Sequence, residues 1–308
     1  MLYEFAVEPA VLSSWQRVRY FLDGFGPSKG RLLAEYPKRW KRMVYEALAT
    51  SGVRPVEKAR IEERLRSLDK SVLVSRQGAV FDPARPWLKN AEQEHARQPF
   101  RAIIANEASS CPQAIDADDV DERSPMWNVE HGRLVARTPE GIGAALGPLV
   151  ARAERVIVVD PYFSPMLSSK IVILGAIARQ MREGAALEVH VALKEDGPQL
   201  EWLANAARKR IGAAVPTGIQ VVLRYWRVPG PHQPAPVRFH NRYVMTATAG
   251  VKFGDSLERG DEGHEDHVSL LDETSRGKLW RQYDQGEGLQ AAARLTVDGG
   301  GSATAVKQ

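Results

Sequence analysis

The sequence has 308 residues, of which 44% are hydrophobic and 26% are charged. These proportions are ordinary for a globular protein, so they exclude a chain that is disordered throughout. The length suits two domains or one large α/β domain, and no run approaches the roughly 18 apolar residues that a membrane-spanning helix needs.

The first residues and the cysteine content predict the cellular setting. The start of the chain holds Glu4 and Glu8 and lacks a basic segment, so we expect no secretory signal. Cys111 is the only cysteine, which excludes an internal disulfide and argues against a zinc site built from cysteines. We therefore expect a cytoplasmic protein in a reducing environment, with no cofactor and no membrane span.

Residues 1–110 are predicted to form a mainly helical, basic region. Three segments have apolar residues at helical spacing with charges on the opposite face, namely 13–22, 36–49 and 56–68. The region contains 19 Lys and Arg residues against 13 Asp and Glu residues, so we expect an anionic partner for it.

One segment of this region is a candidate for contact with nucleic acid. Lys38, Arg39 and Arg42 surround Trp40, and cations neutralise phosphates while aromatic rings stack on bases. In a helix, however, Trp40 falls on one apolar stripe with Val44. The alternative is therefore that Trp40 belongs to the core and that the three cations form a solvated rim.

A linker or exposed excursion is predicted at residues 111–128. Residues 109–125 are polar and acidic and have a proline near each end, which is typical of a domain boundary. An α/β domain is then expected over residues 129–290, followed by a disordered, glycine-containing tail over residues 291–308.

The α/β prediction comes from a change in the hydrophobic pattern of the sequence after the linker. Four β-branched runs alternate with three amphipathic segments, which is the signature of a largely parallel sheet with covering helices. The expected strands are 133–137, 155–160, 187–193 and 219–226, and the expected helices are 138–153, 168–182 and 198–211.

A proline-rich loop separates this alternation from the last elements. Four prolines fall between residues 229 and 236, so this segment cannot be a central strand. After it we expect strands at 237–246, 251–253 and 267–271 and a closing helix at 275–283.

The segment after the prolines carries the most informative chemistry. His240 and Arg242 stand two apart on a predicted strand, so their side chains should emerge on the same face. Arg binds phosphate oxygens in a bidentate manner, and His acts as a nucleophile or as an acid and base near neutral pH. A turn at Gly254–Ser256 follows, and it could add backbone N–H groups and the Ser256 hydroxyl.

This segment resembles the motif of the phospholipase D-like superfamily, which reads His-x-Lys, four residues, Asp, six residues, and then Gly with Ser or Gly. His240 matches the histidine, Arg242 stands at the lysine, and Gly254 stands at the glycine with Ser256 two residues beyond. Ala247 stands where the motif has its aspartate, so the motif is degenerate.

The resemblance covers roughly residues 130–285, because the preceding strands and helices, including Val158–Phe163, are similar to the half-domain that precedes the motif in that superfamily. It implies a mixed or parallel sheet with flanking helices. It also implies phosphodiester hydrolysis without a metal, in which one histidine forms a phosphohistidine and a second histidine protonates the leaving group. His240 would be the nucleophile and Arg242 the phosphate clamp. A symmetric dimer would bring two copies of His240 together.

Several other residues are candidates for the site. Asp160 and Tyr162 follow a buried strand at the sheet edge where ligands bind in α/β folds, so we expect them to contact substrate; the alternative is that Asp160 caps the turn and Tyr162 packs. Asp266 and Asp272 flank a strand and could supply the missing carboxylate. The histidines of the loop 262–267 are expected to be solvated rather than to bind a metal.

We therefore predict a protein that binds or hydrolyses phosphodiesters, most simply those of nucleic acid, through His240 and Arg242. Its catalytic activity is left open by the sequence. The alternative is an inactive interaction module of the same fold that acts as a subunit of a larger complex. The resemblance extends to members that serve in bacterial defence.

Overall fold

The structure is a computed structural model that describes residues 1–107, 109–193, 199–228, 239–299 and 303–307. The chain divides into two compact units, Met1–His131 (unit 1) and Gly132–Gln308 (unit 2). The prolines expected to form a loop and the first residues of the strand expected at 237–246 lie outside the described residues.

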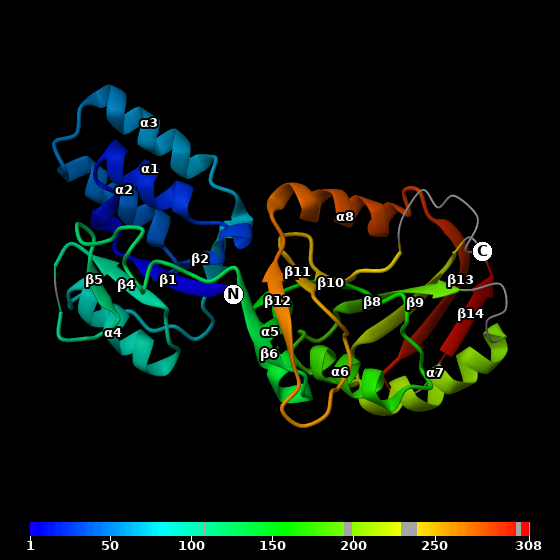
Figure 1. The fold of residues 1–308 in the computed structure, drawn as a ribbon. Coiled ribbons are helices and arrows are strands. Elements are labelled where there is room, and N and C mark those ends of the chain that lie inside the picture. Colours follow the sequence, from blue (N-terminus) through cyan, green and yellow to red (C-terminus); the bar gives the residue numbers. More distant parts are fainter. Residues whose placement is uncertain (108, 194–198, 229–238, 300–302, 308) are drawn as a thin grey trace. The chain divides into compact units, whose positions relative to one another are not determined.

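Unit 1 is built on a five-stranded parallel sheet with the order β3-β2-β1-β4-β5 (Figure 1). The strands are β1 (Tyr3–Val7), β2 (Arg31–Glu35), β3 (Leu73–Ser75), β4 (Ala102–Ala105) and β5 (Ala114–Asp116). The helices are α1 (Trp15–Gly24), α2 (Trp40–Thr50), α3 (Pro55–Arg66) and α4 (Trp87–Arg97), with short 3-10 turns at Pro9–Leu12, Pro27–Lys29 and Lys70–Val72.

Both faces of this sheet are buried. Phe5 and Val7 of β1 pack with residues of α1, α2 and α3 on one face, whereas Ala6 packs with Trp87 of α4 on the other. The three expected helices of this region are present, but the expectation of helices alone missed the sheet. Each strand has only three to five residues, too few to show the alternation that identifies a strand in a sequence.

The expected linker at 111–128 belongs to unit 1. Its strand β5 pairs with β4, and Trp127 is buried with its ring against Phe5 and Phe21. Because this acidic segment is part of the unit, unit 1 holds 20 Lys and Arg residues against 19 Asp and Glu residues, and unit 2 holds 22 against 19. The basic excess of residues 1–110 is thus balanced within one unit and no longer supports an anionic partner for it.

Unit 2 contains a nine-stranded mixed sheet with the order β14-β13-β9-β8-β7-β10-β11-β12-β6. Its central strands β7, β8 and β9 are parallel, and every other neighbouring pair is antiparallel. The strands are β6 (Gly132–Ala136), β7 (Arg155–Val159), β8 (Ala186–Leu193), β9 (Gln220–Arg227), β10 (Arg242–Met245), β11 (Gly250–Phe253), β12 (Glu265–Leu270), β13 (Gln290–Asp298) and β14 (Ala303–Lys307).

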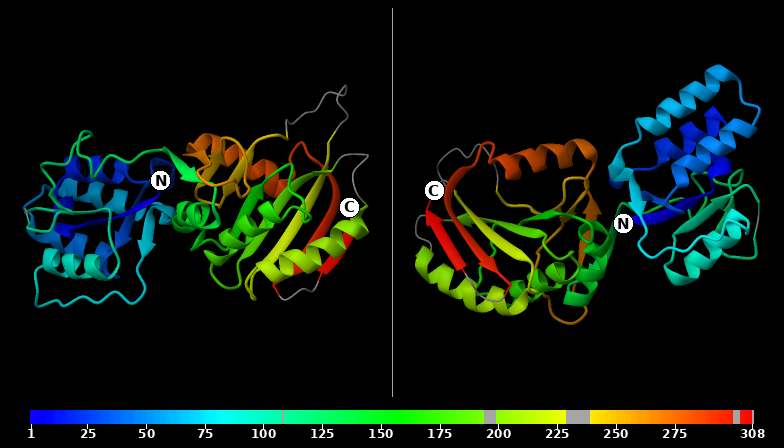
Figure 2. Two further views of the ribbon diagram at one scale, coloured as in Figure 1. Left: turned by 60° about the horizontal axis from the view of Figure 1, so that its bottom comes forward. Right: turned by 180° about the vertical axis from the view of Figure 1, so that it is seen from behind.

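Helices cover both faces of this sheet, as Figures 1 and 2 show. One face carries α5 (Pro139–Val150), α6 (Ser168–Arg179) and α7 (Leu200–Ala214), and the other carries α8 (Glu273–Gln285). Residues Ile157, Val159 and Tyr243 pack with Tyr283 of α8, so the neighbouring positions of β7 and β10 face α5 and α6. The expected α/β class, with a mixed sheet and flanking helices, is confirmed.

Two local expectations for unit 2 need correction. The segment expected to be a disordered tail, 291–308, holds most of β13 and all of β14, and β13 pairs with β9 over its length. The strand expected at 237–246 is shorter, because β10 begins at Arg242 and His240 lies in the turn before it. Among the described residues, no helix is long and apolar enough to cross a membrane.

Deleting residues 290–308 should destabilise unit 2. The deletion removes the buried side chains of Leu295 and Val297, which contribute about 1.5–3 kcal/mol each, and it exposes β9 as an unpaired edge. We expect a lower thermal midpoint and aggregation. A control truncated after Gly299, which loses only β14, should retain a cooperative transition. Equal stability of the two variants and the full chain, measured by circular dichroism, would contradict the assignment of β13 to the fold.

Candidate functional site

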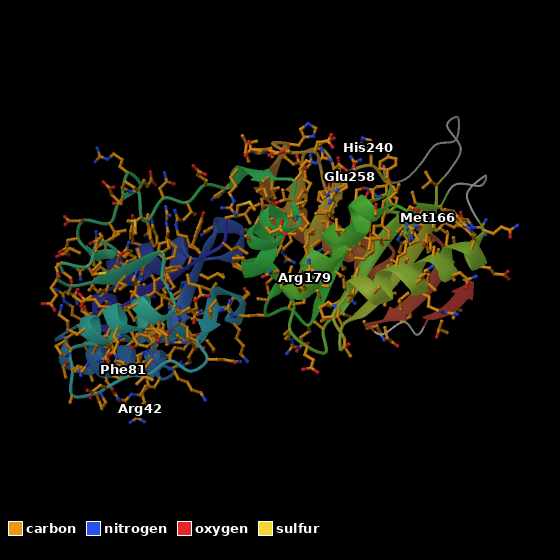
Figure 3. All side chains as sticks on the ribbon, turned by 90° about the horizontal axis from the view of Figure 1, so that it is seen from below. Arg42, Phe81, Met166, Arg179, His240 and Glu258 are labelled. Carbon is orange, nitrogen blue, oxygen red and sulfur yellow. The ribbon has the colours of Figure 1, made fainter. Side chains whose placement is uncertain are left out.

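The two central residues of the sequence motif meet at one side chain, Tyr162. The Tyr162 hydroxyl forms a 2.8 Å hydrogen bond with Nδ1 of His240, and the two rings meet edge to face with centroids 5.8 Å apart. The guanidinium of Arg242 lies 4.9 Å from the centroid of the Tyr162 ring. His240 is exposed at the surface of unit 2 (Figure 3).

Sheet pairing explains why these residues meet. β10 runs antiparallel to β7, with Tyr243 opposite Val159, so the residues before β10 lie beside the residues after β7. The chain places His240 and Arg242 in the first group and Tyr162 in the second. The site is therefore at the end of the sheet where the parallel strands finish, which is where ligands bind in α/β folds.

The contacts leave reactive atoms of both side chains free. Because Tyr162 occupies Nδ1 of His240, the Nε2 atom is the one available to an incoming group. The guanidinium of Arg242 has no hydrogen-bond or ion-pair partner among the described residues, and its Nε is buried without one. A cation with unused donors beside an accessible imidazole can bind a tetrahedral anion.

A buried ion pair holds the Tyr162 loop. Nζ of Lys170, near the start of α6, lies 2.5 Å from Oδ2 of Asp160, and these side chains are 4% and 1% exposed. Oδ1 of Asp160 accepts a hydrogen bond of 3.1 Å from the Tyr162 backbone N–H. Asp160 thus caps the turn, as the alternative interpretation of the sequence had it, and it positions Tyr162 instead of contacting substrate. Tyr162 itself is not packed in the core, because it is 47% exposed.

The turn at Gly254–Ser256 does not form the expected phosphate-binding turn. The Gly254 N–H donates to the carbonyl of His267, and the Asp255 N–H donates to Oδ1 of Asp266, both at 3.0 Å. Ser256 is buried. The two backbone donors are therefore already used within the protein, and the anion would depend on the side chains of His240, in the turn before β10, and Arg242, at the start of β10.

The structure shows where Ala247 lies and which of the two candidate carboxylates, Asp266 or Asp272, could replace the missing motif aspartate. Ala247 lies in the β10–β11 hairpin, at the other end of β10 from His240, where its carbonyl accepts a hydrogen bond from Arg276. Asp266 lies at the start of β12, near the site's end of the sheet, and its Oδ2 is buried without a partner among the described residues. Asp272 instead caps α8 through the Ser275 N–H. Asp266 is thus the better placed of the two candidates.

The cations expected to bind substrate in the first region lie in unit 1. Lys38, Arg39 and Arg42 are all exposed, and Arg42 pairs with Glu46 at 2.9 Å. Trp40 is fully buried, and its indole N–H donates to the Val7 carbonyl at 2.7 Å. The interpretation of Trp40 as a core residue is confirmed, so it offers no stacking surface for a base.

Sequence analysis missed a buried histidine in unit 2. His190 of β8 lies under α8, stacks on Trp226 and accepts a 3.0 Å hydrogen bond from its indole N–H. Burial lowers the pKa of His190. Burial would raise the pKa of neighbouring Glu188, but the His190 contact and the charges of Arg224 and Arg155 outweigh it and bring that pKa to about 2. Because His190 is enclosed, it is a core residue and cannot donate a proton to a substrate.

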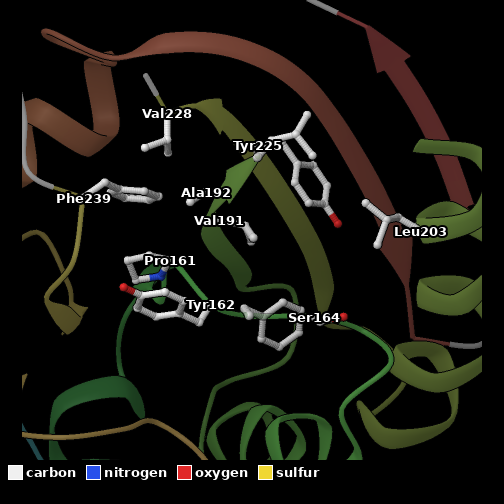
Figure 4. Close-up of a pocket in the computed structure, with 11 residues that line it drawn as sticks. Pro161, Tyr162, Ser164, Val191, Ala192, Leu203, Tyr225, Val228 and Phe239 are labelled. Atoms are coloured by element: carbon white, nitrogen blue, oxygen red, sulfur yellow. The ribbon is translucent and has the colours of Figure 1, made fainter. Parts of the chain in front are cut away.

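A pocket adjoins the site. It has a volume of about 320 Å³ and lies at the carboxyl ends of β7, β8 and β9, with Tyr162 and Phe239 in its wall (Figure 4). The pocket could not be predicted from the sequence, because its residues come from separate strands and loops. No group of three or more His, Cys, Asp or Glu side chains in the described part of the chain is arranged to hold a metal ion.

Comparisons with known proteins do not identify a family for this chain. No protein-family model and no curated protein sequence matches the chain. Among solved structures, TrmBL2, an archaeal chromatin protein with a novel mode of DNA binding, matches 81% of this chain and 94% of its own chain, with 13% sequence identity and a TM-score of 0.26. A TM-score this low does not indicate a common fold, so the match carries no argument.

Replacing Lys170 should test whether the ion pair supports the site. Lys170→Met leaves the Asp160 carboxylate buried without its cation, which typically costs about 3–5 kcal/mol. The double variant Lys170→Met, Asp160→Asn should recover much of that stability, because no uncompensated charge remains. Urea unfolding of the three proteins measures this. Equal stabilities of the single variant and the unmodified chain would show that the pair does not hold the loop.

Proposed function

We propose that unit 2 is a phospholipase D-like module that binds a phosphodiester of nucleic acid at His240 and Arg242 and cleaves it without a metal. The observation that carries this proposal is the shared contact with Tyr162, which holds an imidazole and an unpaired guanidinium at the end of the sheet where the parallel strands finish. Arg242 binds the phosphate oxygens, and His240 is the nucleophile.

In the proposed reaction, the lone pair on Nε2 of His240 attacks phosphorus and one ester P–O bond breaks. The departing oxygen keeps the electron pair of that bond and takes up a proton. Water then attacks the phosphohistidine and gives a proton to the group that protonated the leaving oxygen, and the P–N bond breaks to regenerate the imidazole. Nδ1–H of His240 donates to the Tyr162 oxygen in this scheme, which leaves Nε2 unprotonated for the attack.

The proton for the leaving oxygen needs a second acid. His190 is enclosed in the core, and among the described residues Tyr162 makes the hydrogen bond to His240. We therefore assign the acid to His240 of a second copy of the chain, brought in by a symmetric dimer. A strictly monomeric protein that still cleaves phosphodiesters would contradict this assignment.

A second candidate function rests on the departures from the motif. Ala247 replaces its carboxylate, and the N–H groups of Gly254 and Asp255 are used within the protein. These features favour an inactive module that docks in a larger complex, such as a defence assembly. The two candidates differ in whether His240 reacts.

Cleavage in the presence of EDTA distinguishes the candidates. The unmodified protein should cleave single-stranded DNA, RNA or bis(p-nitrophenyl) phosphate, and His240→Ala should lower the rate by at least about a thousandfold, because the nucleophile is removed. His264→Ala, which replaces an exposed histidine of the β11–β12 loop, is the matched control and should keep the rate. An unmodified protein that cleaves none of these substrates would refute catalysis and support the inactive module.

A further inference from the structure

We propose that the pocket beside Tyr162 binds the base of the nucleotide whose phosphate meets His240 and Arg242. This inference rests on the proposed phosphodiester function and names its substrate class, which is single-stranded nucleic acid. The pocket has a volume of about 320 Å³ and opens at the same sheet end as the phosphate site.

The pocket and the phosphate site share their walls. Tyr162 contacts both His240 and Arg242, and it also lines the pocket. Phe239, which precedes His240 in the chain, lines the pocket as well (Figure 4). One side chain therefore separates a group in the pocket from an anion at His240, which is the relation between a base and its own phosphate in an extended nucleotide.

The lining of the pocket suits a flat ring with polar edges. Aromatic side chains supply much of the wall, namely Tyr162, Phe163, Tyr225 and Phe239. Bases stack on such rings whatever their identity, because every base has a π-face. Ser164, a residue with a hydroxyl group, also lines it.

The size of the pocket argues against a lipid. Pockets for small ligands have volumes of about 300–1,000 Å³, so this one is at the small end and suits a single ring system. The two long acyl chains of a phospholipid would extend beyond it.

A base can enter the pocket only after it leaves a base stack. In a duplex each base is paired and stacked, and taking it out has an energetic cost that is smallest for a strand that is already single. The pocket should therefore select single-stranded over double-stranded nucleic acid, while the phosphate contacts are common to both.

Filling the pocket tests the proposal. Ala192→Phe adds a ring to the pocket wall, and Ala213→Phe adds the same ring at an exposed position of α7 that does not line the pocket. Binding is measured by fluorescence anisotropy with a single-stranded oligonucleotide, the same oligonucleotide with all bases removed, a blunt duplex and vesicles of phosphatidylglycerol. Circular dichroism confirms that each variant is folded, and Phe239→Ala is used in place of Ala192→Phe if that variant is not.

We expect Ala192→Phe to weaken binding of the single strand about tenfold or more and to change binding of the base-free strand less than twofold. Ala213→Phe should bind all ligands as the unmodified chain does. If Ala192→Phe loses the same affinity for both strands, or for neither, the base pocket is overturned. The phosphate site still stands in that case if Arg242→Ala weakens binding of both strands. Tighter binding of vesicles than of the single strand, lost in Ala192→Phe, would assign the pocket to an acyl chain instead. Absence of any binding by the unmodified chain would overturn the proposed function and the pocket together.

Discussion

The account of unit 2 depends on the contacts of one half-exposed tyrosine. The Tyr162 hydroxyl forms a hydrogen bond with Nδ1 of His240, and the Tyr162 ring makes a cation–π contact with the guanidinium of Arg242. A single hydrogen bond contributes about 0.5–1.5 kcal/mol and a cation–π contact about 0.5–2 kcal/mol. These energies are small, but they act on the orientation of two groups. An imidazole and a cation that are oriented before the anion arrives lose less freedom when it binds.

The orientation of Tyr162 is secured below the surface by charge. Asp160 and Lys170 are both enclosed, and removing such ions from water costs several kcal/mol each. An apolar pair could fill the same space at lower cost, but it could not also bond the Tyr162 backbone N–H as Asp160 does. The ion pair thus connects α6 to the loop after β7, and its function is to determine where the loop places its side chains.

The opposite face of the same sheet holds a second cluster of charged side chains, in which Glu188 and His190 are buried and Arg155 and Arg224 are partly exposed. Glu188 lies between Arg224, Arg155 and His190, and α8 covers the group with Tyr283. His190 is fully buried, so its ring cannot contact a ligand from solvent. His240 and His190 therefore differ in role because of burial: His240 can meet a ligand and His190 stabilises the core.

The sequence predicted the elements that are long or strongly patterned. The run RVIVV is a strand because its β-branched residues are buried on both faces, and Thr138 begins α5 by accepting a hydrogen bond from the Gly141 N–H, as expected for an N-cap followed by Pro. The sheet of unit 1 could not be found in this way. Its strands, such as AIIA in β4, are too short to differ from a turn of buried helix, and they are defined by partners distant in the chain.

Residues 291–308 and the site also depend on partners that are distant in the chain, so local sequence could not predict them in full. β13 contains three consecutive alanines after its first residue, which favour a helix, and its pairing with β9 and β14 makes it a strand. His240, Arg242 and Tyr162 could each be singled out from the sequence, and their joint contact followed from the antiparallel pairing of β10 with β7. Lys170 gave a weaker signal, a cation in the first turn of the apolar helix SSKIVILGAIAR, and its partner Asp160 became evident only in three dimensions.

The central claim, that Tyr162 holds His240 and Arg242 ready for a tetrahedral anion, can be observed directly on the imidazole nitrogens. Protein labelled with ¹⁵N-histidine is titrated with orthovanadate, a tetrahedral oxyanion, and the His240 signals are assigned with His240→Gln. The account predicts that the Nε2 signal of His240 shifts on binding, that the Nδ1 signal keeps its hydrogen-bonded position, and that Arg242→Ala weakens vanadate binding at least about tenfold. A His240 spectrum that vanadate does not change, or that changes equally in Arg242→Ala, would contradict it.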